Sequence, residues 1–209
     1  MERHSKGITQ NPCYAHIFFT DAPENTDYEG NSDVLSVDIL TDQSPLEELR
    51  RISNLKPRFS GIVWSLTPHI QADFGVAVMK KFSWDNRTAN SFPKFGGVKQ
   101  ISLVSKKNNL DINTFHNRYQ AHESIARQHH GMQAYAQSMH IEPIYGNHPD
   151  GSEINAISEL WFGTRNDWNE RFYLEASSAE VVKRDTEGFI DFGETQSAIV
   201  TEITHRKYL

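Results

Sequence analysis

Residues 98–126, VKQISLVSKKNNLDINTFHNRYQAHESIA, constrain the fold more than any other stretch of the chain. An apolar run at 98–104 predicts a β-strand, and the polar residues 106–109 predict a tight connection after it. Asp111 then stands where the N-cap of a helix is expected. Apolar, aromatic and imidazole side chains follow at intervals of three and four residues: Ile112, Phe115, Tyr119, His122 and Ala126. This spacing predicts a helix that packs on a sheet and carries a titratable ring towards the interior.

The order of the elements over the second half indicates the fold class. After this first strand and helix we expect a strand within 132–145, a strand at 156–163, a helix capped by Asn166 or Asp167 and carrying Trp168, Phe172 and Ala179, and a strand at 197–203. The order β-α-β-β-α-β is that of the split βαβ, or ferredoxin-like, arrangement. The prediction is therefore an α+β fold in which 98–206 forms an antiparallel four-stranded sheet with two helices on one face.

The first half predicts a shorter version of the same unit. Strands are expected at 13–20, 34–40, 59–66 and 74–82, with a short helix from Ser44, as N-cap, to about Asn54. In 34–40 the side chains of Leu35, Val37 and Ile39 should share one face. The prediction is an incomplete ferredoxin-like half at 12–82, a linker rich in Asn, Ser, Pro and Gly at 83–97, and a complete half at 98–209.

Composition and motifs exclude several function classes. The net charge of −6 comes without a basic stripe, which argues against nucleic-acid binding. No apolar run reaches the length of a bilayer span, and the N-terminus lacks the apolar segment of a signal peptide. Cys13 is the single cysteine, which favours a reducing compartment and hence the cytoplasm. Nucleotide-binding glycine motifs and Cys-x-x-Cys pairs are absent, so we expect neither a nucleotide cofactor nor structural zinc.

Three short stretches of the second half resemble a known family. They are 110–115 at the helix start, Tyr119 with His122 on that helix, and 185–191 followed by a strand that contains Glu202. Together they resemble an EthD domain, a member of the dimeric α+β barrel superfamily, over about residues 98–206. The family's histidine usually lies one position further along, where this chain has Glu123, so His122 and Glu123 are both candidates for its place.

The resemblance implies two ferredoxin-like sheets packed face to face, as a homodimer or as a fused pair. A pocket would then lie between each sheet and its helices. The superfamily includes cofactor-free oxygenases, polyketide cyclases, isomerases, lyases and haem enzymes, so it implies a pocket without defining the reaction.

The candidate catalytic residues follow from the helix at 112–126. An imidazole titrates near neutrality, so His122 is a candidate general acid or base, although it could equally be a core histidine bonded to a backbone carbonyl. Tyr119 lies on the same face and could polarise a substrate oxygen, or be a core aromatic with a bonded hydroxyl. Glu123 is the competing base. The candidate substrate-binding residues are Phe115, Tyr135, Trp161, Trp64 and His16.

Two further polar features bear on buried charge and metal binding. Glu159 shares a predicted strand face with Trp161, and a buried carboxylate there needs a partner or a role. His129, His130 and His140 with Glu123 could in principle bind an ion, but no tight spacing requires it. We therefore predict no metal and no cofactor, while a single histidine ligand to haem stays open.

The leading hypothesis is a cofactor-independent enzyme that acts on a hydrophobic aromatic or polyketide-like small molecule. It would work by general acid/base chemistry of the lyase type, such as dehydration, retro-aldol cleavage, decarboxylation or cyclisation. The alternatives are a cofactor-free monooxygenase of the same fold and a non-enzymatic accessory protein of a degradation or biosynthesis pathway. Cys13, in an apolar strand, should be chemically inert.

Overall fold

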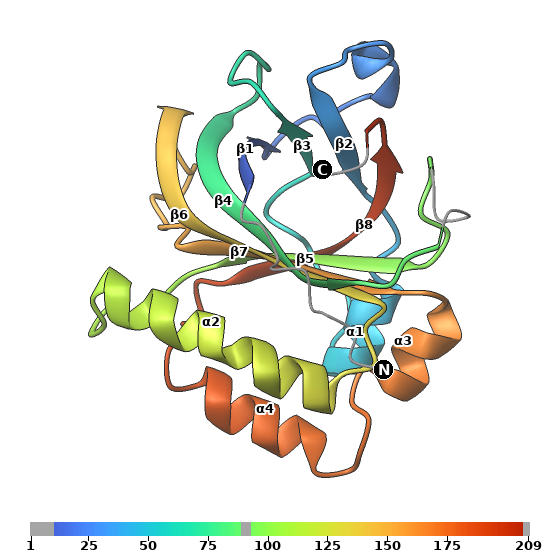
Figure 1. The fold of residues 1–209 in the computed structure, drawn as a ribbon, viewed down its shortest axis with the longest axis vertical. Coiled ribbons are helices and arrows are strands. Elements are labelled where there is room, and N and C mark those ends of the chain that lie inside the picture. Colours follow the sequence, from blue (N-terminus) through green and yellow to red (C-terminus); the bar gives the residue numbers. More distant parts are fainter. Residues whose placement is uncertain (1–10, 89–92, 207–209) are drawn as a thin grey trace, which may run out of the picture.

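The computed structural model describes residues 11–88 and 93–206, whose eight strands form one closed antiparallel barrel (Figure 1). The strands are β1 (Asn11–Phe18), β2 (Val34–Leu40), β3 (Gly61–Ser65), β4 (Phe74–Asp85), β5 (Val98–Val104), β6 (Ala134–Gly146), β7 (Ala156–Phe162) and β8 (Gln196–Thr204). Their order around the barrel is β1-β3-β2-β8-β5-β7-β6-β4, with β4 pairing back to β1. Such closure gives every strand two neighbours and leaves no free sheet edge.

The described part of the chain has four α-helices, which lie outside the barrel, gathered on one side of it (Figure 1). They are α1 (Ser44–Arg50), α2 (Ile112–His129), α3 (Arg165–Arg171) and α4 (Ser178–Thr186), and a 3₁₀ turn, η1, covers Asn25–Tyr28. Among the described helices none combines the length and the apolar composition that crossing a bilayer requires.

The predicted architecture of ferredoxin-like sheets packed face to face, with helices on one face, is wrong. Strand β2 pairs with β8, where Val37 lies opposite Ile203, and β4 pairs with β6 along most of its length. These two pairings join the halves edge to edge, so the strands form a single curved sheet. Closure satisfies the N–H and C=O groups that each half would leave unpaired at its two edges.

Several local predictions need correction. The expected linker at 83–97 begins inside a strand, because β4 continues to Asp85, which lies opposite Ala134. The expected single helix carrying Trp168, Phe172 and Ala179 is two helices, α3 and α4. The N-cap of α3 is Thr164, whose side chain accepts from the Asp167 N–H, rather than Asn166 or Asp167.

Two more differences occur in the first half. Gln43 takes the N-cap position of α1, so Ser44 is its first helical residue, and the helix ends at Arg50. A bulge between Val34 and Ser36 interrupts the alternation of β2, so Leu35 joins a different apolar cluster from Val37. By contrast, the Asp111 cap of α2 is confirmed, since its carboxylate accepts from the Thr114 N–H at 2.9 Å.

Strands β5 and β7 are buried along their whole length on both faces. Side chains that alternate along β5 point either into the barrel, as Lys99 and Ile101 do, or outwards, as Gln100 and Ser102 do. The outward face is covered by the helices. The space between these two layers holds the candidate site.

Candidate functional site

A cavity of about 620 Å³ lies between the outer face of the barrel and the helices. Strands β5, β7 and β8 supply its floor, and α1, α2 and α4 supply most of its walls and roof. The buried face of α2 is built from Phe115, Tyr119, His122 and Ala126, whereas Ile112, which the sequence placed on the same face, is 40% exposed. Tyr119, His122 and Ala126 line the cavity, together with Tyr135 from β6.

His122 is the titratable group best placed to act in this cavity. Its Nδ1 lies 2.6 Å from a carboxylate oxygen of Asp185 on α4, and only 10% of its side chain is exposed. A carboxylate oxygen accepts, so Nδ1–H donates and the lone pair is on Nε2. Burial lowers the pKa of His122 below 6.5, although Asp185 opposes that shift. The imidazole is therefore neutral at pH 7, with Nε2 able to take a proton.

The partner of His122 is a carboxylate rather than the backbone carbonyl that the sequence suggested as an alternative. The partner residue, Asp185, lies 63 residues further along the chain, and the packing of α4 beside α2 brings them together (Figure 1). Such a carboxylate fixes the ring orientation and the tautomer.

Tyr119 places a hydroxyl in the same cavity. Its side chain is 1% exposed, and its oxygen makes no hydrogen bond of normal geometry, although the hydroxyls of Ser158 and Tyr135 lie beside it. Burial raises the pKa values of both phenols, so they are neutral and can donate. Gln137 donates to the Tyr135 oxygen at 3.2 Å. The Tyr119 hydroxyl is therefore protonated and lies at the cavity beside two other hydroxyl groups.

Two predicted residues of α2 lie close to the cavity without lining it. Glu123 forms an ion pair with Lys81 of β4 at 2.6 Å. Phe115 stacks on Tyr119, with ring centroids 5.5 Å apart and planes at 10°, and supports that ring from behind. The structure therefore places His122, and not Glu123, on the cavity wall.

The other three predicted residues lie elsewhere in the fold. Trp64 and Trp161 belong to the barrel interior, where their indole N–H groups donate to Asp38 at 2.8 Å and Glu202 at 3.1 Å. His16 on β1 is fully buried, with Nδ1 2.7 Å from the Tyr145 hydroxyl. None of these three lines the cavity beside His122, because the two tryptophans face the barrel interior and His16 lies on β1, away from the strands of the cavity floor.

Sequence reasoning missed the polar floor of the cavity. The outward faces of β5, β7 and β8 carry Gln100, Ser102, Ser158 and Ser197, all buried. A signal was present, since these uncharged polar residues stand within strands rich in apolar side chains. Asp185 was also missed as a partner of His122, because in the sequence it stands out only as part of a family-like segment.

The barrel interior contains a buried charge network. Lys99 Nζ lies 2.7 Å from Asp38, 2.5 Å from Glu202 and 3.0 Å from Glu159. Lys80 pairs with Glu159 at 2.5 Å, which supplies the partner that a buried carboxylate there requires. Oxygens of the three acids lie within 4.8 Å of one another, a spacing that suits a metal ion. The Lys99 ammonium already contacts all three, so this donor set does not call for one.

The pKa values of the two acids that contact Lys99 most closely are shifted in opposite directions. Burial raises the pKa of Asp38 to about 7, against the attraction of Lys99. Burial also opposes ionisation of Glu202, but Lys99 and a second cation, Arg87 at 2.9 Å, lower its pKa to about 2. The second cation accounts for the difference between the two acids.

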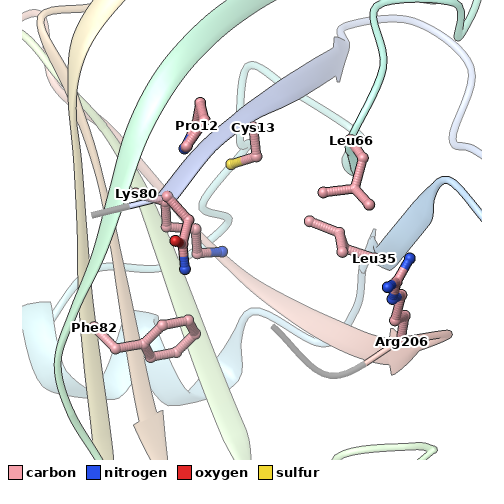
Figure 2. A pocket seen from close by; sticks show the side chains of 8 residues that line it. Pro12, Cys13, Leu35, Leu66, Lys80, Phe82 and Arg206 are labelled. Carbon is pink, nitrogen blue, oxygen red and sulfur yellow. The ribbon is translucent and has the colours of Figure 1, made fainter. Parts of the chain in front are cut away.

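A smaller cavity of about 230 Å³ lies at one end of the barrel interior (Figure 2). Figure 2 shows Lys80 and Phe82 on one side of it and Leu35, Leu66 and Arg206 on the other. Cys13 also lines this space, and burial raises the pKa of its thiol to about 12. The thiol is therefore protonated at neutral pH and a poor nucleophile.

Comparison with known proteins does not place the chain in a family. No protein-family model matches the sequence, and no curated protein matches it at a meaningful level of similarity. The function of this chain therefore has to be inferred from the chemistry of the cavity.

Proposed function

We propose that this protein is a cofactor-independent enzyme in which His122 acts as a general acid/base on a hydrophobic ring compound. The observation that carries the proposal is the His122–Asp185 pair at the cavity wall, which leaves the lone pair of Nε2 for a substrate. The volume of about 620 Å³ lies in the range typical of small-molecule sites. Apolar and aromatic walls favour a hydrophobic ligand; they include Leu46, Leu49, Leu160, Phe172 and Tyr173.

The geometry suits proton transfer next to a carbonyl or hydroxyl group. Asp185 holds the Nδ1–H tautomer, so Nε2 removes a proton from the substrate and can return it at another atom. The Tyr119 hydroxyl donates to the substrate oxygen that gains negative charge, which stabilises the enolate. Dehydration, retro-aldol cleavage and cyclisation all use these two roles, so we propose a lyase-type reaction.

Three wider expectations remain part of the proposal. The cytoplasm is the compartment that best fits a buried, unpaired Cys13. The EthD-like family assignment and a homodimer stay predictions; sedimentation of the purified protein tests the homodimer.

A proton-exchange assay tests the catalytic role without knowledge of the natural substrate. The probe is 2-tetralone, whose C1 protons exchange in D₂O through an enolate, followed by NMR. His122→Gln and His122→Phe should lower the catalysed rate roughly 10²–10⁴-fold while the protein stays folded. Asp185→Asn should lower the rate as well, because an amide no longer holds His122 in the Nδ1–H tautomer.

The control is Glu123→Gln, which breaks an ion pair outside the cavity and should leave exchange unchanged. If Glu123→Gln abolished exchange while His122→Gln retained it, the base would be Glu123. Oxygen uptake during turnover would move the reaction to the monooxygenase class. An unchanged rate in every variant would favour a non-enzymatic accessory role.

A further inference from the structure

Three serines form one row across three adjacent strands on the floor of the 620 Å³ cavity. Ser102 on β5 lies directly opposite Ser158 on β7 and Ser197 on β8. The Ser102 and Ser197 hydroxyl oxygens are 2.9 Å apart, and Gln100 Nε2 donates to Ser102 at 3.0 Å. The four side chains are only 5–8% exposed. We refer to Gln100, Ser102, Ser158 and Ser197 as the polar floor.

The polar floor is costly for a sheet face that helices cover. Such faces usually carry aliphatic residues, as the neighbouring Val98, Leu160 and Ile199 do. The Gln100 side-chain oxygen is buried without a hydrogen bond, and so is the Tyr119 hydroxyl, which also lines the cavity. A buried polar atom without a partner destabilises the folded protein. These groups have hydrogen-bonding capacity that the protein itself does not use, and all of them border one cavity.

We infer that the polar floor binds the oxygens of an uncharged, flat ring compound with at least two hydroxyl or carbonyl groups. Neighbouring strands lie about 4.8 Å apart, so adjacent serines can each meet a different oxygen on one edge of a ring system. The aromatic and aliphatic walls then cover the two faces of the rings. The inference rests on the proposed function for the reaction at His122, whereas binding to the floor can be measured separately.

The ligand should carry no charge where it meets the polar floor, because no charged side chain of the described residues lies there. Arg50 and Lys183 are the charged side chains among the described lining residues, and both are exposed at its edge. His122 is neutral at pH 7, and Asp185 is already bonded to it. A carboxylate buried against the serines would lack a counter-ion, which is strongly unfavourable.

Calorimetry with three naphthalene probes tests the ligand class. At pH 7 we expect 1,3-dihydroxynaphthalene to bind at least about 10-fold more tightly than 2-naphthol, and 2-naphthoate to bind weakest. Ser102→Ala and Ser158→Ala should each weaken binding of the diol roughly 3- to 10-fold. The matched control is Ser138→Ala: this serine is also buried on a strand, but it makes no hydrogen bond to a described residue and does not line the cavity.

Thermal stability separates a binding role from a structural one. Ser158→Val should raise the melting temperature, because an aliphatic side chain suits this face better, and should still weaken binding of the diol. If the polar floor had only a structural role, Ser158→Val would instead lower the melting temperature. The inference is overturned if the diol binds no more tightly than 2-naphthol, if 2-naphthoate binds best, or if the floor variants bind like the wild type.

The same variants distinguish failure of this inference from failure of the proposed function. His122→Gln should bind the diol within about twofold of the wild type while losing proton exchange. If binding depends on the ring oxygens but proton exchange does not depend on His122, the inference about the polar floor stands and the proposed reaction is wrong. If exchange depends on His122 but binding does not depend on the ring oxygens, the proposed reaction stands and the inference about the polar floor is wrong.

Discussion

Replacing Lys99 by methionine should be among the most destabilising single changes in this protein. Lys99→Met keeps an unbranched side chain of similar length and removes the ammonium that contacts Asp38, Glu159 and Glu202. All four side chains are almost completely inaccessible to solvent, so water cannot replace the lost cation. Breaking a buried ion pair by removing one partner costs about 3–5 kcal/mol. For a protein of this size that corresponds to a drop in Tm of roughly 6–20 °C.

The stability that Lys99→Met loses should be larger at higher pH. Without Lys99 the buried carboxyl groups hold their protons to higher pH, and the pKa of Asp38 is already raised to about 7 by burial. A carboxyl group whose folded pKa lies above its unfolded pKa destabilises the fold as pH rises between the two values. The stability gap between Lys99→Met and the wild type should therefore widen from pH 5 to pH 8.

Urea denaturation at both pH values measures these effects. Adding Asp38→Asn to Lys99→Met should recover at least about 1 kcal/mol, because it removes one stranded charge and keeps an acceptor for Trp64. The control is Arg184→Ala, which breaks an ion pair that is largely exposed and should change stability by less than about 0.5 kcal/mol. A Lys99→Met loss below about 1 kcal/mol, or a double variant no more stable than the single one, would refute this account of the network.

Four further outcomes are expected. The exchange rate should decline on acidification only below pH 6.5, because burial lowers the pKa of His122; a pH–rate profile measures this. Cys13→Ala should keep full exchange activity, and the native thiol, with a pKa of about 12, should not react with Ellman's reagent at pH 8 before unfolding. Burial lowers the pKa of His16 to about 4, so on acidification the unfolded state takes up this proton before the folded state does. His16 should therefore lower the free energy of unfolding by up to about 3 kcal/mol between pH 6.5 and pH 4. In urea titrations His16→Gln should make the free energy of unfolding less dependent on pH over this range. Residues 1–90 expressed alone should aggregate, because β2 and β4 lose their partner strands β8 and β6; a soluble fragment with a cooperative melt would contradict this.

Local features of the fold could be read from the sequence because they depend on neighbouring residues. The strand at Val98–Val104, the Asp111 cap and the buried face of α2 follow from spacing and capping chemistry within one segment. The position of His122 on that face was predictable for the same reason. Its partner Asp185 was not, because only the packing of α4 beside α2 brings the two together.

Closure of the barrel could not be read from the sequence. It depends on β2 meeting β8 and β4 meeting β6, and no local pattern specifies those partners. The four predicted strands of each half fit two separate sheets equally well, until their unpaired edges are considered.

Alternation along the strands placed Glu159 and Trp161 on one face but did not say which face it was. In most antiparallel sheets one face meets water, and the polar side chains identify it. Here β5 and β7 are buried on both faces, by the barrel interior on one side and by the helices on the other. Polar residues therefore occur on both faces, as a charge network inside and as the row of serines outside. Only the tertiary structure decides which of these two polar groups, the charge network or the row of serines, lies at the cavity with His122.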